Sequence, residues 1–198
     1  MTDRVVVLLL GPPQAPAAPP GCDGALFAAA MAEDVFAVFG ELEGIDEAIA
    51  FSDPAGAALA GSLAWPGTAL VQLAAGSALP DLWRQVTERG YRQAAIVVAD
   101  APDLPALHVA KAFSALGSSA AAAAPAVNGG LVILAGRLPP PPGVAGADMD
   151  RPPPPGVRRT LPWHRLRRPG DLARLDPGLE GWEATRALLP AGSSPGPT

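Results

Sequence analysis

The chain has 198 residues, including 41 alanines, 22 glycines and 25 prolines, and carries a formal net charge of −5. Leu, Ile, Val and Phe supply 47 residues, above the ~20% of a chain below which disorder is typical, so we expect one folded domain with a modest core. The single cysteine, Cys22, excludes an intramolecular disulfide, and with only two histidines a cysteine-based zinc site is not expected.

The two charge signs are unevenly distributed along the chain. Residues 1–150 carry a net charge of −9 and residues 151–198 a net charge of +4, and no lysine or arginine lies between Arg4 and Arg84. Nucleic-acid binding needs a basic stripe that neutralises phosphates. The local arginine cluster at 158–168 is better interpreted as a solvated face or as a partner for the acidic half. We therefore expect no nucleic-acid partner.

The first predicted element is an apolar run at residues 5–10, which Gly11 ends. A secretory signal needs an apolar core of ~7–15 residues and a membrane helix needs ~20, so the run fits neither. It is typical of a buried first strand. The sequence predicts a cytoplasmic protein with no membrane association.

Further along the chain, short Val-, Leu- and Ile-rich runs alternate with longer Ala-rich segments, which is the pattern of an α/β sheet. The strand at 94–99 is continuously apolar, as expected for a central strand covered on both faces. The expected strands lie near 4–10, 47–51, 69–74, 94–99, 120–124 and 131–135, and the expected helices near 24–40, 78–89, 105–116 and 179–189.

Two tetraproline runs, at 139–142 and 152–155, bracket a short segment rich in Gly and Asp, and together they make up residues 138–156. Polyproline lacks backbone donors and favours an extended helix, which predicts a stiff surface connection. We expect one domain over residues 1–190, with this connection inside it, and a disordered tail over 191–198.

The first candidate site is the loop at 11–21, because ligands of α/β proteins bind at the carboxyl ends of strands. Gly11 would line such a site. A phosphate cradle uses backbone N–H groups and usually a cation, whereas this loop has five prolines and no basic residue. A rigid structural loop is therefore favoured over a phosphate site.

The second candidate is Asp100, which directly follows the predicted strand at 94–99. A carboxylate in this position suits a magnesium ion that bridges nucleotide phosphates, and it equally suits a turn. Asp103 precedes Leu104 and Pro105, the pattern of an N-cap followed by proline in the first helical turn. We interpret Asp103 as that cap.

The third candidate is Asn128, Gly129 and Gly130, between the last two predicted strands. Consecutive glycines allow positive φ and close backbone approach to a ligand. An Asn-Gly pair between strands is equally typical of a hairpin turn.

Other catalytic patterns are missing from the sequence, which has no Gly-x-Ser-x-Gly, no Walker lysine and no Gly-x-Gly-x-x-Gly. We interpret His108 and His164 as surface or hydrogen-bonded histidines, and the four tryptophans as core or edge packing.

Three segments, taken in order, resemble a bacterial family of glycosyltransferase-A-fold proteins that includes nucleotide-diphospho-sugar transferase-like and selenodomain-associated transferases. Its distant relatives include 2-phospholactate guanylyltransferase and molybdenum-cofactor guanylyltransferase. Residues 100–105 resemble the family's Asp-Ser-Pro-x-Leu-Pro, and residues 125–131 resemble Pro-Ala-x-Asp-Gly-Gly-Tyr. Residues 161–172 resemble Leu-Pro-x-Trp followed by Asp-x-Asp-Thr-Pro-x-Asp-Leu. The resemblance implies that Asp100 holds a metal.

The chain departs from the family pattern where the chemistry is expected. Pro20-Gly21-Cys22-Asp23 does not reproduce the family's Lys-Thr-Arg-Leu-like element, Asn128 replaces an aspartate, and Arg165 and Arg167 replace two more. If the replaced carboxylates once completed a metal site, we expect the arginines to occupy the cation's place and to pair with Asp100.

The sequence therefore predicts a single-domain α/β protein of glycosyltransferase-A type, with a three-layer arrangement around a mostly parallel twisted sheet. One hypothesis is a nucleotide- or nucleotide-sugar-dependent transferase with an impaired site, in which Asp100 holds Mg²⁺ or Mn²⁺ and Gly11, Asn128, Gly129 and Gly130 contact the nucleotide. The other is a non-catalytic binding or scaffolding protein that keeps the fold and needs no cofactor. A third, less favoured reading is a generic α/β protein whose motifs match by chance.

Overall fold

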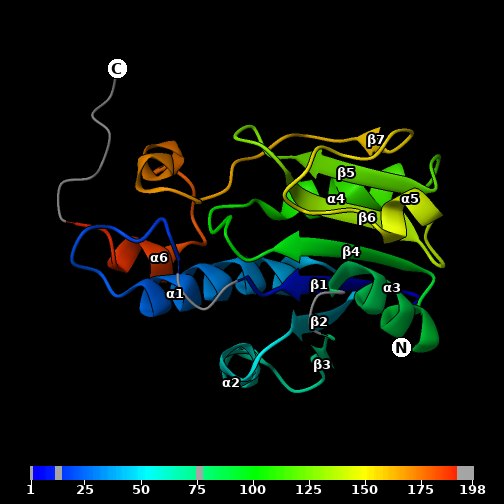
Figure 1. The fold of residues 1–198 in the computed structure, drawn as a ribbon, viewed down its shortest axis with the longest axis horizontal. Coiled ribbons are helices and arrows are strands. Elements are labelled where there is room, and N and C mark those ends of the chain that lie inside the picture. Colours follow the sequence, from blue (N-terminus) through cyan, green and yellow to red (C-terminus); the bar gives the residue numbers. More distant parts are fainter. Residues whose placement is uncertain (1, 12–14, 75–77, 191–198) are drawn as a thin grey trace.

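The computed structural model describes residues 2–11, 15–74 and 78–190, and in these ranges the chain forms one seven-stranded sheet (Figure 1). The strand order is β3-β2-β1-β4-β6-β5-β7. In chain order the strands are β1 (Arg4–Leu9), β2 (Asp46–Phe51), β3 (Ala69–Gln72), β4 (Gln93–Val98), β5 (Ala121–Pro125), β6 (Leu131–Arg137) and β7 (Arg158–Arg159).

The sheet is mostly parallel, as the sequence predicts. The pairs β1–β2, β1–β4, β2–β3 and β5–β7 are parallel, whereas β6 runs antiparallel to both β4 and β5. Strand β4 stands in the middle, and its residues from Ala94 to Val98 are buried. The expected α/β class and the central position of this strand are confirmed.

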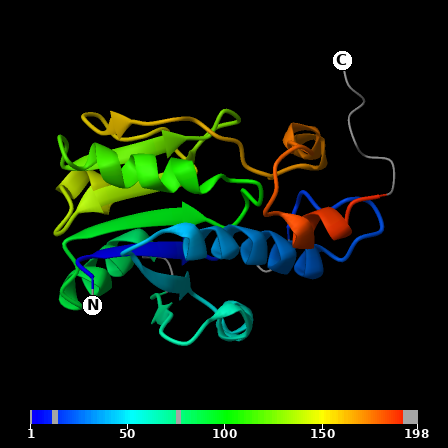
Figure 2. The same cartoon turned by 180° about the vertical axis from the view of Figure 1, so that it is seen from behind.

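Helices cover both faces of the sheet (Figures 1 and 2). Helices α1 and α4 lie on one face, and α3 and α5 lie on the other, while α6 packs against α1 beyond the carboxyl ends of β1 and β4. The helices are α1 (Gly24–Ala37), α2 (Pro54–Leu63), α3 (Ala78–Glu88), α4 (Ala106–Ala115), α5 (Pro142–Ala145) and α6 (Glu183–Ala187), with 3₁₀ helices η1 (Val38–Glu41) and η2 (Pro169–Arg174).

Helix α2 was not expected from the sequence, because its residues are mostly alanine and glycine and only Ala60 among them is buried. Its start is nevertheless encoded locally. Asp53 Oδ1 accepts a hydrogen bond from the backbone N–H of Gly56 at 2.8 Å, and Pro54 occupies the first turn. Both features favour helix initiation.

The proline-rich connection at 138–156 is not extended throughout, in contrast to the prediction. It contains the short helix α5, which begins at Pro142 because the fixed φ of proline suits a first helical position. The helix expected at 179–189 is confined to the five residues of α6. The predicted tail at 191–198 lies outside the described residues.

The core consists of the sheet and the inner faces of its helices, with Trp83 and Phe39 among its largest buried side chains. A second, smaller cluster packs the C-terminal segment onto α1, where Phe27 and Met31 meet Leu166 and Trp182. Trp65, in contrast, is exposed and packs in neither cluster. No helix in the described ranges is long and apolar enough to cross a membrane.

Candidate functional site

A cavity of about 590 Å³ opens at the carboxyl ends of β1 and β4. Strand β1 lies between β2 and β4, so the chain reverses its direction of crossing between β1 and β4. Ligands of open α/β sheets bind at such a switch point. The cavity is lined by residues 9–11, one face of α1, the start of α2, and residues 98–100, 149–150 and 165–167.

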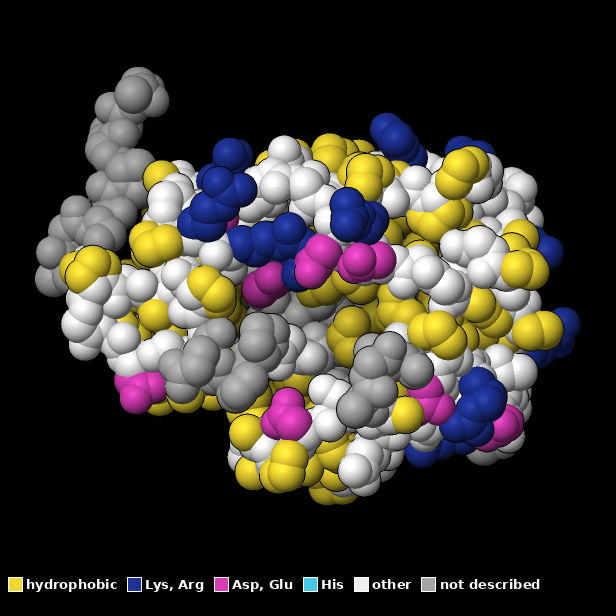
Figure 3. All heavy atoms as spheres, in the orientation of Figure 1, with side chains coloured by type: hydrophobic (Ala, Val, Ile, Leu, Met, Phe, Trp, Pro, Cys, Tyr) yellow, Lys and Arg dark blue, Asp and Glu magenta, His cyan; other side chains and the backbone are white. Residues whose placement is uncertain are grey.

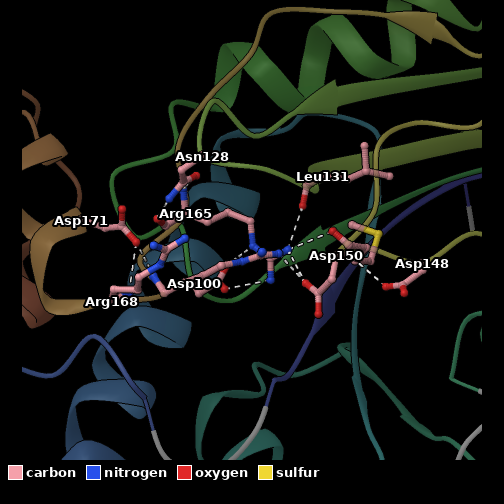
Figure 4. A network of polar contacts seen from close by, with 10 residues as sticks. Asp100, Asn128, Leu131, Asp148, Asp150, Arg165, Arg168 and Asp171 are labelled. Carbon is pink, nitrogen blue, oxygen red and sulfur yellow. Dashed lines mark hydrogen bonds and ion pairs between the residues drawn. The ribbon is translucent and has the colours of Figure 1, made fainter.

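Asp100 lies in this cavity, and its carboxylate is engaged by Arg165 (Figure 4). Arg165 Nε donates to Asp100 Oδ1 at 2.7 Å and Arg165 Nη2 donates to Asp100 Oδ2 at 2.8 Å. Two parallel bonds between guanidinium and carboxylate are the strongest arrangement of this ion pair. The pairing of Asp100 with an arginine that the sequence analysis expects is therefore observed for Arg165.

The guanidinium of Arg165 also bridges Asp100 to a second carboxylate. Its Nη1 donates to Asp150 Oδ1 at 2.9 Å and to the Met149 carbonyl at 3.0 Å. Only 9% of the Arg165 side chain is exposed. Burial lowers the pKa of Arg165, but Asp100 and Asp150 outweigh that effect, so the pKa is raised above its ordinary value. Arg165 is therefore a fixed cation inside the site.

Arg167 does not pair with Asp100, in contrast to the expectation. Its Nη2 donates to Asp150 Oδ1, and its side chain lies at the cavity wall. Arg165 points inward along the carboxyl end of β4, whereas Arg167 lies closer to solvent, with 27% of its side chain exposed. Residues two apart in an extended segment point to the same side, and accordingly both arginines line the cavity and donate to Asp150.

Asn128 and Gly130 hold the arginine segment in place. Asn128 Nδ2 donates to the Arg165 carbonyl at 2.6 Å, and the backbone N–H of Arg165 donates to Asn128 Oδ1 at 3.2 Å (Figure 4). Gly130 has a φ of +81°, and a Cβ there would lie 2.5 Å from the Met149 carbonyl oxygen and 2.8 Å from Arg167 Nη2. The close approach that glycine allows at this position is made here by the protein's own chain, at the Met149 carbonyl.

Of the residues that the sequence analysis expects to contact a nucleotide, some line the cavity and others do not. Gly11 lines the cavity, while Asn128, Gly129 and Gly130 form the β5–β6 hairpin turn and are not among its described lining residues. Residues 12–14 of the expected phosphate loop lie outside the described ranges. The contribution of Asn128, Gly129 and Gly130 to ligand binding stays a prediction.

Asp103 does not cap helix α4, because the N-cap is Pro105 and no side chain caps the helix. Its buried carboxylate instead joins three segments. It accepts from Trp163 Nε1 at 3.2 Å and from the backbone N–H of Asp176 at 3.2 Å, and His164 Nε2 lies 2.9 Å from it. The interpretation of Asp103 as a cap is wrong, since a buried carboxylate gains more from these partners than from a helix end.

A divalent cation does not fit this set of side chains. Both oxygens of Asp100 accept from Arg165, and Oδ1 of Asp150 accepts from Arg165 and Arg167. Mg²⁺ binds oxygens at ~2.0–2.1 Å, so it would stand beside a buried guanidinium of the same charge sign. Within residues 2–11, 15–74 and 78–190, no group of three or more His, Cys, Asp and Glu side chains could hold a metal ion.

Sequence reasoning did not identify Asp150 or the alanine face of α1. Asp148 and Asp150 stand out as the two acidic residues between the proline runs, which is the signal that could have drawn attention to them. Ala25, Ala28 and Ala32 recur at helical spacing and line the cavity. Alanine is too common in this chain for that spacing to mark a site.

A family model described as "Uncharacterized protein conserved in bacteria (DUF2064)" matches residues 36–148. No curated protein matches the sequence. Among solved structures, one from Desulfovibrio desulfuricans G20, provisionally assigned as a nucleotide-diphospho-sugar transferase, aligns with a TM-score of 0.75 and 17% identity over 95% of this chain and 97% of its own.

Two structures of Rv0371c from Mycobacterium tuberculosis H37Rv are also similar. One aligns with a TM-score of 0.53 and 14% identity over 94% of this chain and 97% of its own. The other, a complex with manganese, has a TM-score of 0.51 and 16% identity over 95% of this chain and 98% of its own. At these identities the likeness establishes the fold, which is that of nucleotide-diphospho-sugar transferase-like proteins.

Proposed function

The chain belongs to the bacterial family DUF2064, and on that premise we propose that it is a ligand-binding protein that keeps a transferase fold without metal-dependent catalysis. The observation that carries the proposal is the pair of hydrogen bonds from Arg165 to both oxygens of Asp100. The one carboxylate at the end of the central strand is committed to an internal cation. What remains at the switch point is a cavity of a size suited to a small molecule.

The surroundings of this pair support a permanent arrangement. Asn128 fixes the Arg165 backbone from one side, and the backbone N–H of Leu166 donates to the Asp100 carbonyl at 2.7 Å from the other. Leu166 is buried in the cluster that joins the C-terminal segment to α1. Withdrawal of Arg165 to free Asp100 for a metal would therefore disturb both main-chain and core contacts.

The second candidate function is a transferase that uses a nucleotide or nucleotide sugar together with Mg²⁺ or Mn²⁺. The observation in its favour is the position of Asp100, directly after β4 and inside the cavity at the switch point. It requires that Arg165 give up Asp100 when substrate and metal bind.

Thermal unfolding separates the two functions. The wild type and Asp100→Ala are melted in chelator, then with Mg²⁺ or Mn²⁺, each alone and with a panel of nucleotides and nucleotide sugars. We expect divalent ions to leave the melting temperature of both proteins unchanged, and Asp100→Ala to melt lower in chelator because Arg165 loses its main partner. Stabilisation of the wild type alone by divalent ions would overturn the proposal.

Asp148→Ala is the matched control for this experiment. Asp148 lies in the same segment as Asp150, its side chain is 60% exposed, and its ion pair to Arg151 spans 3.9 Å. An exposed pair of that kind contributes little, and the hydrogen bond that Asp148 Oδ1 accepts from the Asp150 N–H at 2.8 Å is exposed as well, so this variant should melt close to the wild type and respond to divalent ions as the wild type does.

A further inference from the structure

The walls of the cavity are almost entirely apolar. All of its described lining residues except four are aliphatic residues, methionine, proline or glycine. Among these described residues there is no aromatic ring on which a nucleobase could stack and no side-chain amide or hydroxyl that could hydrogen-bond to its edge. A pocket of this chemistry gains binding energy from an apolar ligand surface and little from a nucleoside.

The four charged residues gather at one end of the cavity. Asp100, Asp150, Arg165 and Arg167 sum to zero net charge, and Figure 3 shows basic and acidic side chains in one band across this face of the molecule. Such an end does not match the several negative charges of a nucleoside diphosphate or triphosphate. It suits a ligand that carries at most one charged group.

The unused hydrogen-bonding capacity at this end consists mainly of donors. Arg165 already donates to Asp100, Asp150 and the Met149 carbonyl. Arg167 has five guanidinium N–H groups, and within the described residues that guanidinium donates only to Asp150. A ligand that offers acceptor oxygens to Arg167 would complete the site.

We propose that this cavity binds a small amphipathic acid, a molecule with an aliphatic body and a single carboxylate or phosphate that Arg167 recognises. The inference rests on the proposed function and names the class of ligand for it. The aliphatic body lies against the alanine face of α1 and the side chains of Leu9 and Leu59. The volume of about 590 Å³ falls within the ~300–1,000 Å³ of small-molecule pockets.

Isothermal titration of the full chain in chelator tests the ligand class with hexanoate, octanoate and decanoate below their micellar concentrations. We expect affinity to rise about fourfold with each added methylene, the increment that corresponds to burial of one CH₂. Octanol and octylammonium supply the same body with a neutral and a cationic end. Both should bind at least about tenfold more weakly than octanoate, since a charge-assisted hydrogen bond is lost. Octyl phosphate distinguishes a phosphate from a carboxylate ligand.

Two variants, each with a matched control, test where the ligand binds. Ala29→Trp fills the cavity from α1 and should abolish octanoate binding, whereas Ala58→Trp on the exposed side of α2 should not. Arg167→Gln should weaken the binding of octanoate at least about tenfold and leave the binding of octanol unchanged. Arg168 is an exposed arginine that is not among the described lining residues of the cavity, so Arg168→Gln should leave the affinities for octanoate and octanol unchanged. Melting temperatures verify that each variant is folded.

The outcomes separate this inference from the proposed function. Equal or tighter binding of octanol than octanoate, or unchanged binding by folded Ala29→Trp, would overturn the ligand class. Binding of a nucleotide sugar in chelator, without binding of any alkyl acid, would also overturn the ligand class but leave the proposed function standing. Stabilisation by Mg²⁺ or Mn²⁺ that depends on Asp100 would overturn the proposed function itself.

Discussion

Arg165 places its guanidinium against Asp100 through two hydrogen bonds of 2.7 and 2.8 Å, at the carboxyl end of the central strand. The two residues are far apart in the sequence, and the β5–β6 hairpin brings them together by holding the Arg165 backbone through Asn128. A protein cation thus meets the carboxylate that a transferase would use for metal.

Removal of one partner of this pair should destabilise the fold more than removal of both. Asp100→Ala leaves the buried Arg165 with Asp150 as its remaining carboxylate partner. We expect a loss of about 3 kcal/mol, the low end of the range for broken buried pairs, because 24% of the Asp100 side chain is exposed. The double variant Asp100→Leu with Arg165→Met replaces both charges with apolar groups and should recover most of that loss.

Urea unfolding of the wild type, Asp100→Ala, Asp100→Leu, Arg165→Met and the double variant measures these differences in the free energy of unfolding, and the last three with the wild type form a double-mutant cycle. Additive losses in the double variant would contradict a direct interaction between the two side chains.

The two glycines of the hairpin should differ in their tolerance of alanine. Both have positive φ, +100° at Gly129 and +81° at Gly130, so alanine at either position costs about 1 kcal/mol of backbone strain. At Gly129 the added Cβ meets open space, whereas at Gly130 it would collide with the Met149 carbonyl. Gly130→Ala should therefore cost about 1–3 kcal/mol more, by the usual penalty for overpacking.

Chemical denaturation of both variants gives this comparison, with Gly129→Ala as the internal control. Equal losses would show that the segment at 149–150 moves aside at no cost and does not fix the position of Arg167.

The parts of this fold that the sequence predicts are those whose signal is local. The apolar run that became β4 and the turn signal of Asn128 and Gly129 each identify their element without knowledge of the rest of the chain. Helix α2 is composed mainly of alanine and glycine, with Ala60 its one buried residue, so it has no stripe of large apolar side chains that periodicity could have found.

The site is only partly predictable for a different reason. Asp100 follows a buried strand and could be identified from that alone, but its partner Arg165 is chosen by a long-range contact. The family pattern pointed to Arg165 and Arg167 through a reversal of charge, and of these two only Arg165 pairs with Asp100. Asp150 has neither a local pattern nor a motif, and only the path of the proline-rich connection brings it to Arg165.

Nucleoside triphosphates should bind weakly or not at all. The sequence has no lysine or arginine from residue 5 to residue 83. Of the next arginines, Arg84 is paired with Asp81 and Glu88, and Arg89 contacts the Leu70 carbonyl at the edge of the sheet. Calorimetric titration with GTP or CTP and Mg²⁺ should give a Kd weaker than about 1 mM, equivalent to less than ~4 kcal/mol. Micromolar binding would mean that backbone groups replace the missing cations.

His108 should make the stability of the protein depend on pH. It lies on α4 with its ring edge-on to Trp163 at 4.8 Å, and burial lowers its pKa below the ordinary value of 6.5. The unfolded chain therefore takes up a proton at a higher pH than the folded one. The stability that depends on neutral His108 is fully present above pH 6.5 and is lost as the pH falls from there through the lower folded-state pKa.

His108→Phe keeps an aromatic ring against Trp163 and removes the titration. Urea unfolding of both proteins between about pH 8 and pH 5 cancels the other titrating groups in the difference between them. We expect the wild type to lose stability relative to His108→Phe as the pH falls, with the largest change below pH 6.5, where the unfolded histidine becomes charged. A difference that stays constant across this range would show that His108 is protonated as readily in the folded chain as in the unfolded one.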